Sequence, residues 1–335
     1  MTVRVAINGF GRIGRLVARA IVETGHSDVE LVAINDPGGN FFPLLKYDSI
    51  HGRAHFTVER NGDDEIIIDG KRVRRFRSRD PHELHWGEEH VDIVLECTGK
   101  FNHREGAQIH LDNGAKKVLI SAPAEGEDLT VVYGVNHDKL EKDHKIVSNA
   151  SCTTNCLAPL AYAIHKEIGI EKGFMTTIHA YTGDQNTVDA SHKDPFRARA
   201  AAINMIPTST GAAKAVGKVL PELSGKLDGV SIRVPVPNVS LVDLKFVPSK
   251  KVTVEEINEA VKKYANGSMK GVLAVYDDPC VSSDFNHDPH SSIFNLNGTK
   301  VIDSDFVRVM SWYDNEWGFS CRMIDTALAM HKIGY

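Results

Sequence analysis

A cysteine at the start of a predicted helix is the residue of this chain best placed for covalent chemistry. Cys152 lies in the segment Ser148-Asn149-Ala150-Ser151-Cys152-Thr153-Thr154-Asn155-Cys156. The residues before it, 145–148, are typical of a short buried strand, and apolar residues at helical spacing follow it over 157–167. The N-terminus of a helix favours a negative charge. We therefore predict that the thiol pKa of Cys152 is lowered and that Cys152 is a nucleophile.

The second cysteine of the segment, Cys156, is expected to serve packing. The four-residue spacing places both cysteines on one helical face, unlike the C-x-x-C of redox or zinc sites. Taken alone, the segment leaves open that both are ordinary small core residues.

A histidine at the end of a predicted strand is the second candidate. Residues 174–179 have strand character and end at His179, and polar and small residues follow as far as Pro207. Loops of that length in compact domains are usually functional. The alternative for His179 is a neutral histidine of the core.

A glycine-rich turn near the N-terminus predicts a dinucleotide site. Gly9, Gly11 and Gly14 stand between a predicted strand (3–8) and a helix, and the next strand (29–35) ends before Asp36. In such a unit the first glycine allows the tight turn, the second admits a pyrophosphate and the third lets helix pack on strand. Asp36 is expected to accept hydrogen bonds from a ribose.

Composition excludes several classes of protein. The chain has 335 residues, a net charge of -5, 42% hydrophobic and 25% charged residues, which is typical of a globular protein of two domains. The basic run 71–77 is flanked by acidic residues and is expected to be a solvated strand face. The five cysteines form neither a disulfide nor a zinc pattern. We predict a cytoplasmic protein without a metal, and with neither nucleic acid nor membrane as partner.

The order of elements predicts two kinds of sheet. Strands at 92–96, 118–121 and 131–135, with a helix at 103–113, would complete a parallel sheet in the first half. Long strands without intervening helices (230–235 and 241–247), and others at 272–276, 292–295 and 307–313, indicate a mostly antiparallel sheet in the second. Helices are expected at 211–220, at 253–266 behind a capping box, and at 317–332.

Six segments together resemble phosphorylating glyceraldehyde-3-phosphate dehydrogenase. They are Asn8–Arg15, Ser148–Leu157, the run from His179 to Gln185, Pro207–Lys214, Arg233–Pro235 and Ser311–Gly318. The resemblance implies an α/β fold: a Rossmann-type dinucleotide-binding domain (1–150), an α+β catalytic domain with a mostly antiparallel sheet (151–316) and a C-terminal helix returning to the first domain (317–335). Family members are usually homotetramers.

The resemblance also implies a mechanism. Cys152 would attack the aldehyde of glyceraldehyde 3-phosphate, with His179 as its base, and inorganic phosphate would cleave the resulting thioester. The substrate phosphate would be held by Thr182 and Arg233, with Asp184 orienting nearby groups. The attacking phosphate would be held by Ser151, Thr153, Thr210 and Gly211, with Arg197 between the two pockets.

The cofactor implied is NAD, with activity on NADP as an open question. By resemblance the remaining cofactor residues are Arg12, Ile13, Arg79, Thr98, Ser121 and Asn315. The carboxylate of Asp36 disfavours a 2′-phosphate, whereas Gly38, Gly39 and Ser191 stand where NAD-specific members often carry bulkier residues and a proline. Phe319 replaces a tyrosine that is common in the family.

Three other functions remain open at this point. A related enzyme for a longer substrate, such as erythrose 4-phosphate, would cleave the thioester with water. A nucleotide-binding or redox-sensing protein would not need Arg197 and Arg233. A Cys/His hydrolase would leave the dinucleotide unit without a purpose.

Overall fold

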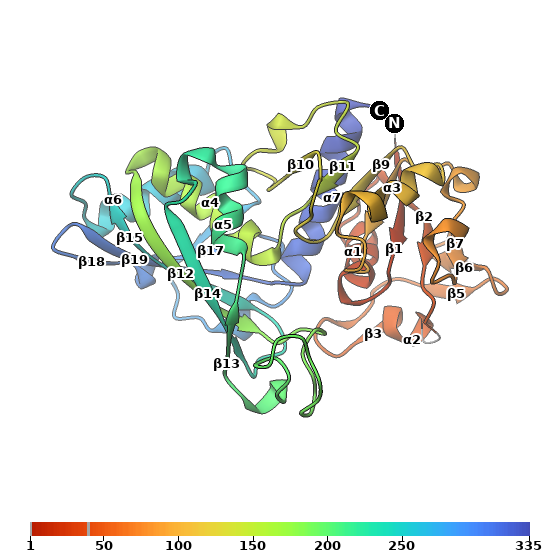
Figure 1. The fold of residues 1–335 in the computed structure, drawn as a ribbon, viewed down its shortest axis with the longest axis horizontal. Coiled ribbons are helices and arrows are strands. Elements are labelled where there is room, and N and C mark those ends of the chain that lie inside the picture. Colours follow the sequence, from red (N-terminus) through yellow and green to blue (C-terminus); the bar gives the residue numbers. More distant parts are fainter. Residues whose placement is uncertain (1, 39–40) are drawn as a thin grey trace. The chain divides into compact units, whose positions relative to one another are not determined.

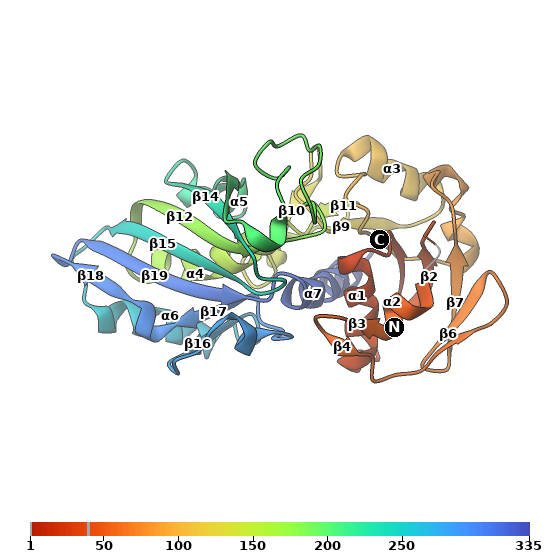
Figure 2. The same cartoon turned by 90° about the horizontal axis from the view of Figure 1, so that it is seen from below.

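The structure is a computed structural model that describes residues 2–38 and 41–335. The chain forms two compact units (Figures 1 and 2). Unit 1 comprises Met1–Tyr133, His137–Ala150 and Ser320–Tyr335, and unit 2 comprises Gly134–Asn136 and Ser151–Phe319. The predicted domain bounds (1–150, 151–316 and 317–335) stay a prediction.

Unit 1 is built on a nine-stranded sheet in the order β10-β11-β9-β8-β1-β2-β7-β6-β5. The six strands from β10 to β2 and the pair β2–β7 are parallel, while β7, β6 and β5 continue as antiparallel neighbours. The strands are β1 (Val3–Asn8), β2 (Val29–Asn35), β5 (Val58–Arg60), β6 (Glu65–Ile68), β7 (Lys71–Phe76), β8 (Ile93–Glu96), β9 (Lys117–Ile120), β10 (Leu129–Thr130) and β11 (Ile146–Ser148). A separate two-stranded pair joins β3 (Tyr47–Asp48) and β4 (Gly52–Arg53).

The strand order of unit 1 reverses between β1 and β8. The connection from β1 through α1 (Arg12–Glu23) leads to β2 on one side, and that from β8 through α3 (Arg104–Asp112) leads to β9 on the other. Right-handed crossovers then place α1 and α3 on opposite faces of the sheet. The carboxyl ends of β1 and β8 therefore border the crevice where such sheets bind ligands. Helix α2 (Phe41–Lys46) also belongs to unit 1, and α7 (Trp317–Ile333) begins in the last residues of unit 2 and belongs to unit 1 from Ser320 onward.

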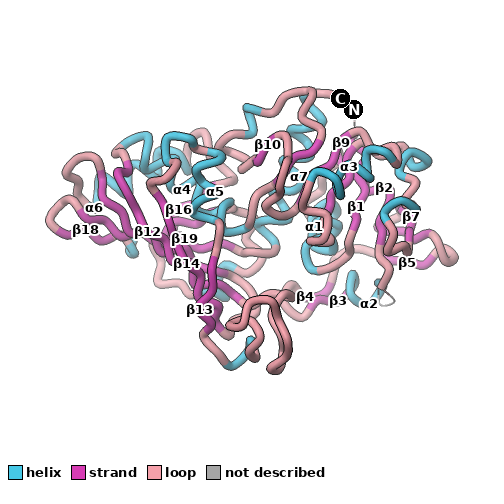
Figure 3. Tube along the Cα trace, in the orientation of Figure 1, coloured by secondary structure: helices cyan, strands magenta, loops and turns pink. Residues whose placement is uncertain are grey.

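Unit 2 is an eight-stranded sheet in the order β13-β14-β12-β15-β19-β17-β16, with β18 on β19. Five of its pairs are antiparallel, and β12–β14 and β16–β17 are parallel. The strands are β12 (Ile170–Ala180), β13 (Ile206–Ser209), β14 (Leu227–Val234), β15 (Ser240–Pro248), β16 (Leu273–Tyr276), β17 (Ser292–Asn295), β18 (Lys300–Ile302) and β19 (Phe306–Tyr313). Figure 3 shows the segment between β12 and β13 mainly as loop.

One face of the unit 2 sheet carries a layer of helices. Helix α4 (Cys152–Glu167) packs on β12, β15, β17 and β19, and α5 (Ala212–Val219) and α6 (Val254–Ala265) both pack against α4. Burial alternates along β15, as the two-residue period of a strand covered on one face requires. The predicted capping box of α6 is confirmed: the hydroxyl of Thr253 accepts from Glu256 N, and the Glu256 carboxylate accepts from Thr253 N.

The predicted fold class is confirmed, and most predicted elements appear within a few residues of their expected bounds. The strand predicted at 131–135 is wrong: pairing ends at Thr130, and Gly134, with φ +86°, turns the chain. No helix in the described residues is long and apolar enough to cross a membrane.

Candidate active site and dinucleotide pocket

Cys152 is the first residue of α4. Ser151 caps this helix, because its hydroxyl accepts from Thr154 N at 3.1 Å. The cap stabilises the turn that carries the thiol. Cys156, one turn further on, is fully buried, with Sγ near the Ser292 hydroxyl and the Ser311 carbonyl, so it packs in the core as predicted.

His179, near the end of β12, faces Cys152. Its Nε2 atom lies 3.6 Å from Sγ of Cys152, and its Nδ1 atom lies 2.6 Å from the Ala180 carbonyl oxygen. A carbonyl can only accept, so Nδ1 carries the proton. In the neutral ring Nε2 is then unprotonated and available to accept the thiol proton.

The pKa values of this pair differ from the sequence-based expectation. Burial raises the pKa of the Cys152 thiol, and the positive charge of Arg233 and hydrogen bonds from Thr153 offset this only in part. Burial, together with the charges of Arg233 and Arg197, lowers the pKa of His179 to about 3. The predicted lowering of the thiol pKa is therefore wrong, because desolvation outweighs the helix N-terminus. Both shifts favour the uncharged forms, a thiol beside a neutral imidazole.

Tyr313 packs against His179 and was not predicted as a site residue. Its hydroxyl lies 2.8 Å from Oγ1 of Thr153 and 2.9 Å from Oγ1 of Thr177. Its ring stands edge-on to His179, with centroids 6.0 Å apart. Tyr313 thus ties the first turn of α4 to β12. Its position as the last residue of a strand was the available signal.

Two predicted arginines lie around the pair. Arg233 on β14 donates through Nη1 to the Ala180 carbonyl at 3.2 Å and to Thr182 Oγ1 at 3.3 Å. Arg197 is paired with Asp184 (Nη1–Oδ2 2.7 Å). Burial lowers the pKa of Arg233, and so does the charge of Arg197, because two like charges lie near one another. Four of the predicted substrate residues thus form two pairs in direct contact, Arg233 with Thr182 and Arg197 with Asp184.

The other predicted phosphate residues lie at helix N-termini. Gly211 is the N-cap of α5, and a Cβ at this position would meet no other atom within 4 Å. The Thr210 hydroxyl accepts from Ala212 N at 3.2 Å.

Asn315, in the turn after β19, accepts at Oδ1 from the Ser240 hydroxyl at 2.8 Å.

A pocket of about 360 Å³ in unit 1 lies at the carboxyl ends of β1, β2 and β8. It is lined by five of the predicted cofactor residues: Gly9, Gly11, Asp36, Arg79 and Thr98. Gly9 and Gly14 have the tight turn and the close packing predicted for them. Gly9 has φ +93° and approaches Thr98 so closely that a Cβ would lie 2.7 Å from its backbone. A Cβ on Gly14 would lie 2.1 Å from the Gly9 carbonyl oxygen.

The remaining predicted cofactor residues do not line this pocket. Gly14 is buried in packing, and the Arg12 guanidinium is paired with the carboxylate of Asp48. Ile13 and Ser121 also lie outside the lining, while Ser191 and Asn315 belong to unit 2, where Ser191 is exposed. Gly39 lies outside the described residues.

A buried carboxylate under the pocket was missed from the sequence. Glu96 accepts from Asn8 Nδ2 (2.6 Å), from Thr98 N (2.7 Å) and from the Thr98 hydroxyl. His110 lies 2.9 Å from it through Nε2, which carries the proton because Nδ1 accepts from Trp86 Nε1. Asn8 in turn accepts from Asn35 Nδ2. Asn8, Asn35 and Glu96 each end a strand, and this shared position was the signal.

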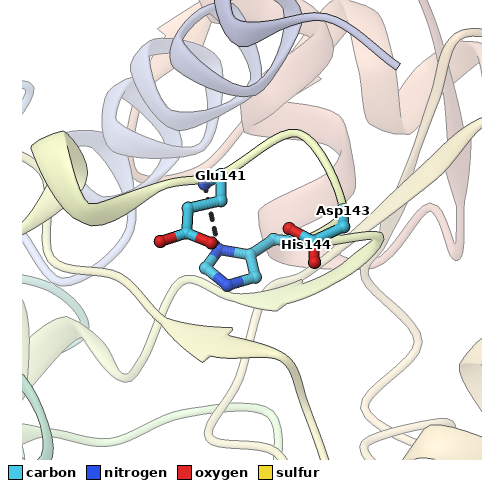
Figure 4. A group of neighbouring side chains, drawn as sticks. All are labelled: Glu141, Asp143 and His144. Atoms are coloured by element: carbon cyan, nitrogen blue, oxygen red, sulfur yellow. Dashed lines mark hydrogen bonds between the residues drawn. The ribbon is translucent and has the colours of Figure 1, made fainter.

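One group in the described residues could hold a metal ion. Glu141, Asp143 and His144 lie together in the turn before β11 (Figure 4). Nδ1 of His144 already accepts from Glu141 N at 3.1 Å, and both acidic side chains are exposed. Nothing else at this group points to an ion, and the absence of a metal stays a prediction.

Comparison with known proteins supplies the family. The glyceraldehyde 3-phosphate dehydrogenase NAD-binding domain matches residues 3–104, and the C-terminal domain of the same enzyme matches residues 151–315. The chain is 61% identical to glyceraldehyde-3-phosphate dehydrogenase of Xanthobacter flavus, over 100% of both chains. It is 60% identical to that of Cereibacter sphaeroides, over 99% of this chain and 100% of the relative. The Geobacillus stearothermophilus protein of the same name is 54% identical over 98% of both. The chain therefore belongs to the glyceraldehyde-3-phosphate dehydrogenase family.

Proposed function

We propose that this NAD-dependent oxidoreductase carries out its reaction on Cys152, converting glyceraldehyde 3-phosphate and inorganic phosphate to 1,3-bisphosphoglycerate through a thioester. The contact between Sγ of Cys152 and Nε2 of His179 carries the proposal. It pairs a nucleophile with a base whose other nitrogen is already committed to a carbonyl.

The side chains perform the steps in a fixed order. Sγ of Cys152 attacks the aldehyde carbon while Nε2 of His179 takes the thiol proton, which gives a hemithioacetal and an imidazolium. The imidazolium then donates its proton to the oxygen that was the carbonyl, and Nε2 of His179 takes this proton back when the adduct is oxidised. Bound NAD supplies the electron acceptor for oxidation of this adduct to the thioester. Attack by phosphate on the thioester releases the acyl phosphate and restores Cys152.

The substrate phosphate is assigned to Arg233 and Thr182. Nε of Arg233 is buried and has no hydrogen-bond partner in the described part of the chain, so the guanidinium retains a donor for an anion. Guanidinium forks suit phosphate oxygens, and a buried site strengthens the attraction. Asp184 holds Arg197 in place between the two anion sites.

The attacking phosphate is assigned to the N-termini of α4 and α5, with Ser151, Thr153, Thr210 and Gly211. Helix N-termini favour anions. Because Thr210 Oγ1 accepts from Ala212 N, its hydroxyl proton remains for donation to phosphate. The open space at Gly211 supports the same assignment.

NAD is assigned to the unit 1 pocket, where the residues fit the group. Gly11 at the start of α1 presents backbone without a side chain, and Asp36 stands at the end of β2 to accept from a ribose. The backbone turn at Arg12 and Ile13 is assigned to the pyrophosphate, and Asn315 to the nicotinamide amide. Activity on NADP is proposed as secondary, with Ser191 as the residue that permits it.

Self-association and location complete the proposal. Unit 2 exposes large apolar side chains in and beside the loop before β13: Val188 70%, Phe196 56%, Ile203 80% and Met205 77%. Exposed apolar residues gathered in this way mark interaction surfaces and support a homotetramer. The five free cysteines support a reducing, cytoplasmic location.

One assay tests the proposed function against the alternative of a related enzyme that cleaves the thioester with water. NADH production from glyceraldehyde 3-phosphate is measured with and without inorganic phosphate. The proposal requires sustained turnover only with phosphate. Equal turnover without phosphate would identify an enzyme that hydrolyses the thioester with water.

A further inference from the structure

Ser240 forms a hydrogen-bonded bridge between two groups to which the proposed function gives separate tasks. It is the first residue of β15 and is 1% exposed. Its Oγ accepts from Ala180 N at 3.0 Å and donates to Asn315 Oδ1 at 2.8 Å. Both bonds use one hydroxyl, so the positions of Ala180 and Asn315 depend on the same atom.

The first bond acts on the residue that orients the base. The Ala180 carbonyl accepts from Nδ1 of His179 at 2.6 Å and from Nη1 of Arg233 at 3.2 Å. Ser240 holds the amide of the same residue. It therefore helps to fix Ala180, and with it the imidazole, whereas Arg233 keeps a second contact at Thr182.

The second bond decides which way the Asn315 amide faces. Because Ser240 donates to Oδ1, this oxygen points to Ser240 and Nδ2 points away. In the described residues Nδ2 has no hydrogen-bond partner. Two N–H groups thus remain for the carbonyl oxygen of a carboxamide.

We propose that Ser240 is a positioning residue that couples the orientation of His179 to the orientation of the nicotinamide anchor Asn315. The proposal rests on the proposed function. The task needs a group that accepts and donates at once from a buried position. Serine and threonine provide this, cysteine does so weakly and alanine not at all.

The experiment compares steady-state constants of Ser240→Ala, Ser240→Thr and Ser240→Cys. We expect Ser240→Ala to raise KM for NAD about tenfold, as the loss of one hydrogen bond in a binding site allows, and to lower kcat, with KM for glyceraldehyde 3-phosphate changed less than twofold. Ser240→Thr should retain near wild-type constants. If Ser240→Ala does not fold, Ser240→Cys, which keeps the volume, should show the same pattern at smaller size.

Ser231→Ala is the matched control. Ser231 lies on β14 of the same sheet, separated from β15 by β12; it is 2% exposed, and its hydroxyl has no partner in the described residues. Its loss should leave KM for NAD unchanged. Similar effects of Ser231→Ala and Ser240→Ala would reduce Ser240 to a general packing role and overturn the proposal.

A double-mutant cycle with Asn315→Ala isolates the coupling. In the Asn315→Ala background, Ser240→Ala should change KM for NAD less than twofold, because the bond it acts through is already gone. Fully additive effects would overturn the proposal while leaving the role of Asn315 intact. An Asn315→Ala variant with wild-type KM for NAD would instead overturn the assignment of Asn315, and the coupling with it.

Discussion

The Nε2 atom of His179 lies 3.6 Å from Sγ of Cys152, on the side of the ring opposite the nitrogen that donates to Ala180. This relationship fixes the direction of proton transfer, from sulfur to nitrogen. Since burial disfavours both charged forms, the proposed function requires the proton transfer to accompany attack on the substrate.

Alkylation of Cys152 should depend steeply on pH. Burial raises the pKa of this thiol above its ordinary value of 9.0, and only the thiolate reacts. The rate with iodoacetamide, followed by mass spectrometry of the peptide, should therefore still be rising at pH 9. His179→Asn should alkylate more slowly than the wild type at each pH, because the base beside the thiol is gone. A plateau of full reactivity from pH 6 upward would show a preformed thiolate–imidazolium pair instead.

Acid should destabilise the protein partly through His179. Its pKa is about 3 in the folded chain against an ordinary 6.5, so the unfolded chain binds the proton first. Stability is therefore lost as the pH falls from about 6.5 towards 3, by up to about 1.4 kcal/mol per pH unit from this residue, and this loss is absent above pH 6.5. Urea unfolding of His179→Asn should show a shallower dependence in that window.

His55→Asn is the control for the acid experiment, because His55 is exposed. Its pH dependence should match that of the wild type. If His179→Asn loses stability in acid as steeply as His55→Asn, His179 is not the buried neutral base described above.

Arg233→Lys should impair use of the phosphorylated substrate. Lysine keeps the charge but lacks the planar fork of arginine, in which Nη1 donates to Ala180 and Thr182 while Nε remains for an anion. We expect kcat/KM for glyceraldehyde 3-phosphate to fall roughly tenfold or more, the scale of one charged hydrogen bond, and the value for unphosphorylated glyceraldehyde to fall much less. Arg199→Lys, at an exposed ion pair with Asp189, is the control and should change neither. Equal losses on both substrates would assign Arg233 a structural role.

Cofactor choice should respond to Asp36 and Ser191 in opposite ways. Asp36 and Arg79 both line the dinucleotide pocket, and a carboxylate at this position disfavours a 2′-phosphate. Asp36→Ala should therefore shift the ratio of kcat/KM values towards NADP. Ser191→Pro should reduce activity on NADP and spare activity on NAD. A wild-type protein without detectable turnover at millimolar NADP would refute the secondary activity.

The elements of the site were predictable where local patterns determine them. The glycine turn, the start of α4 at Cys152 and the end of a strand near His179 all follow from short-range spacing, and each is in the structure. The parallel pairing of β12 with β14 was not predictable, because nothing local records which strand lies beside which. The same long-range pairing brings Arg233 to Ala180.

The properties that depend on burial could not be predicted from the sequence. The helix N-terminus predicts a low thiol pKa for Cys152, but the surrounding chain removes water from the sulfur and reverses the direction. Glu96, Tyr313 and Ser240 were missed for a related reason. Their roles arise from hydrogen bonds between residues that are distant in sequence.

The most direct test of the account is a single-turnover measurement without phosphate. Enzyme at micromolar concentration is mixed with NAD and glyceraldehyde 3-phosphate, and NADH is followed by absorbance. We expect a burst close to one NADH per active site, then arrest with Cys152 acylated, and renewed turnover once phosphate is added. Cys152→Ser should give no burst, whereas Cys156→Ser should keep it if the core tolerates the change. A burst that survives in Cys152→Ser, or an acyl group found on another residue, would contradict the account.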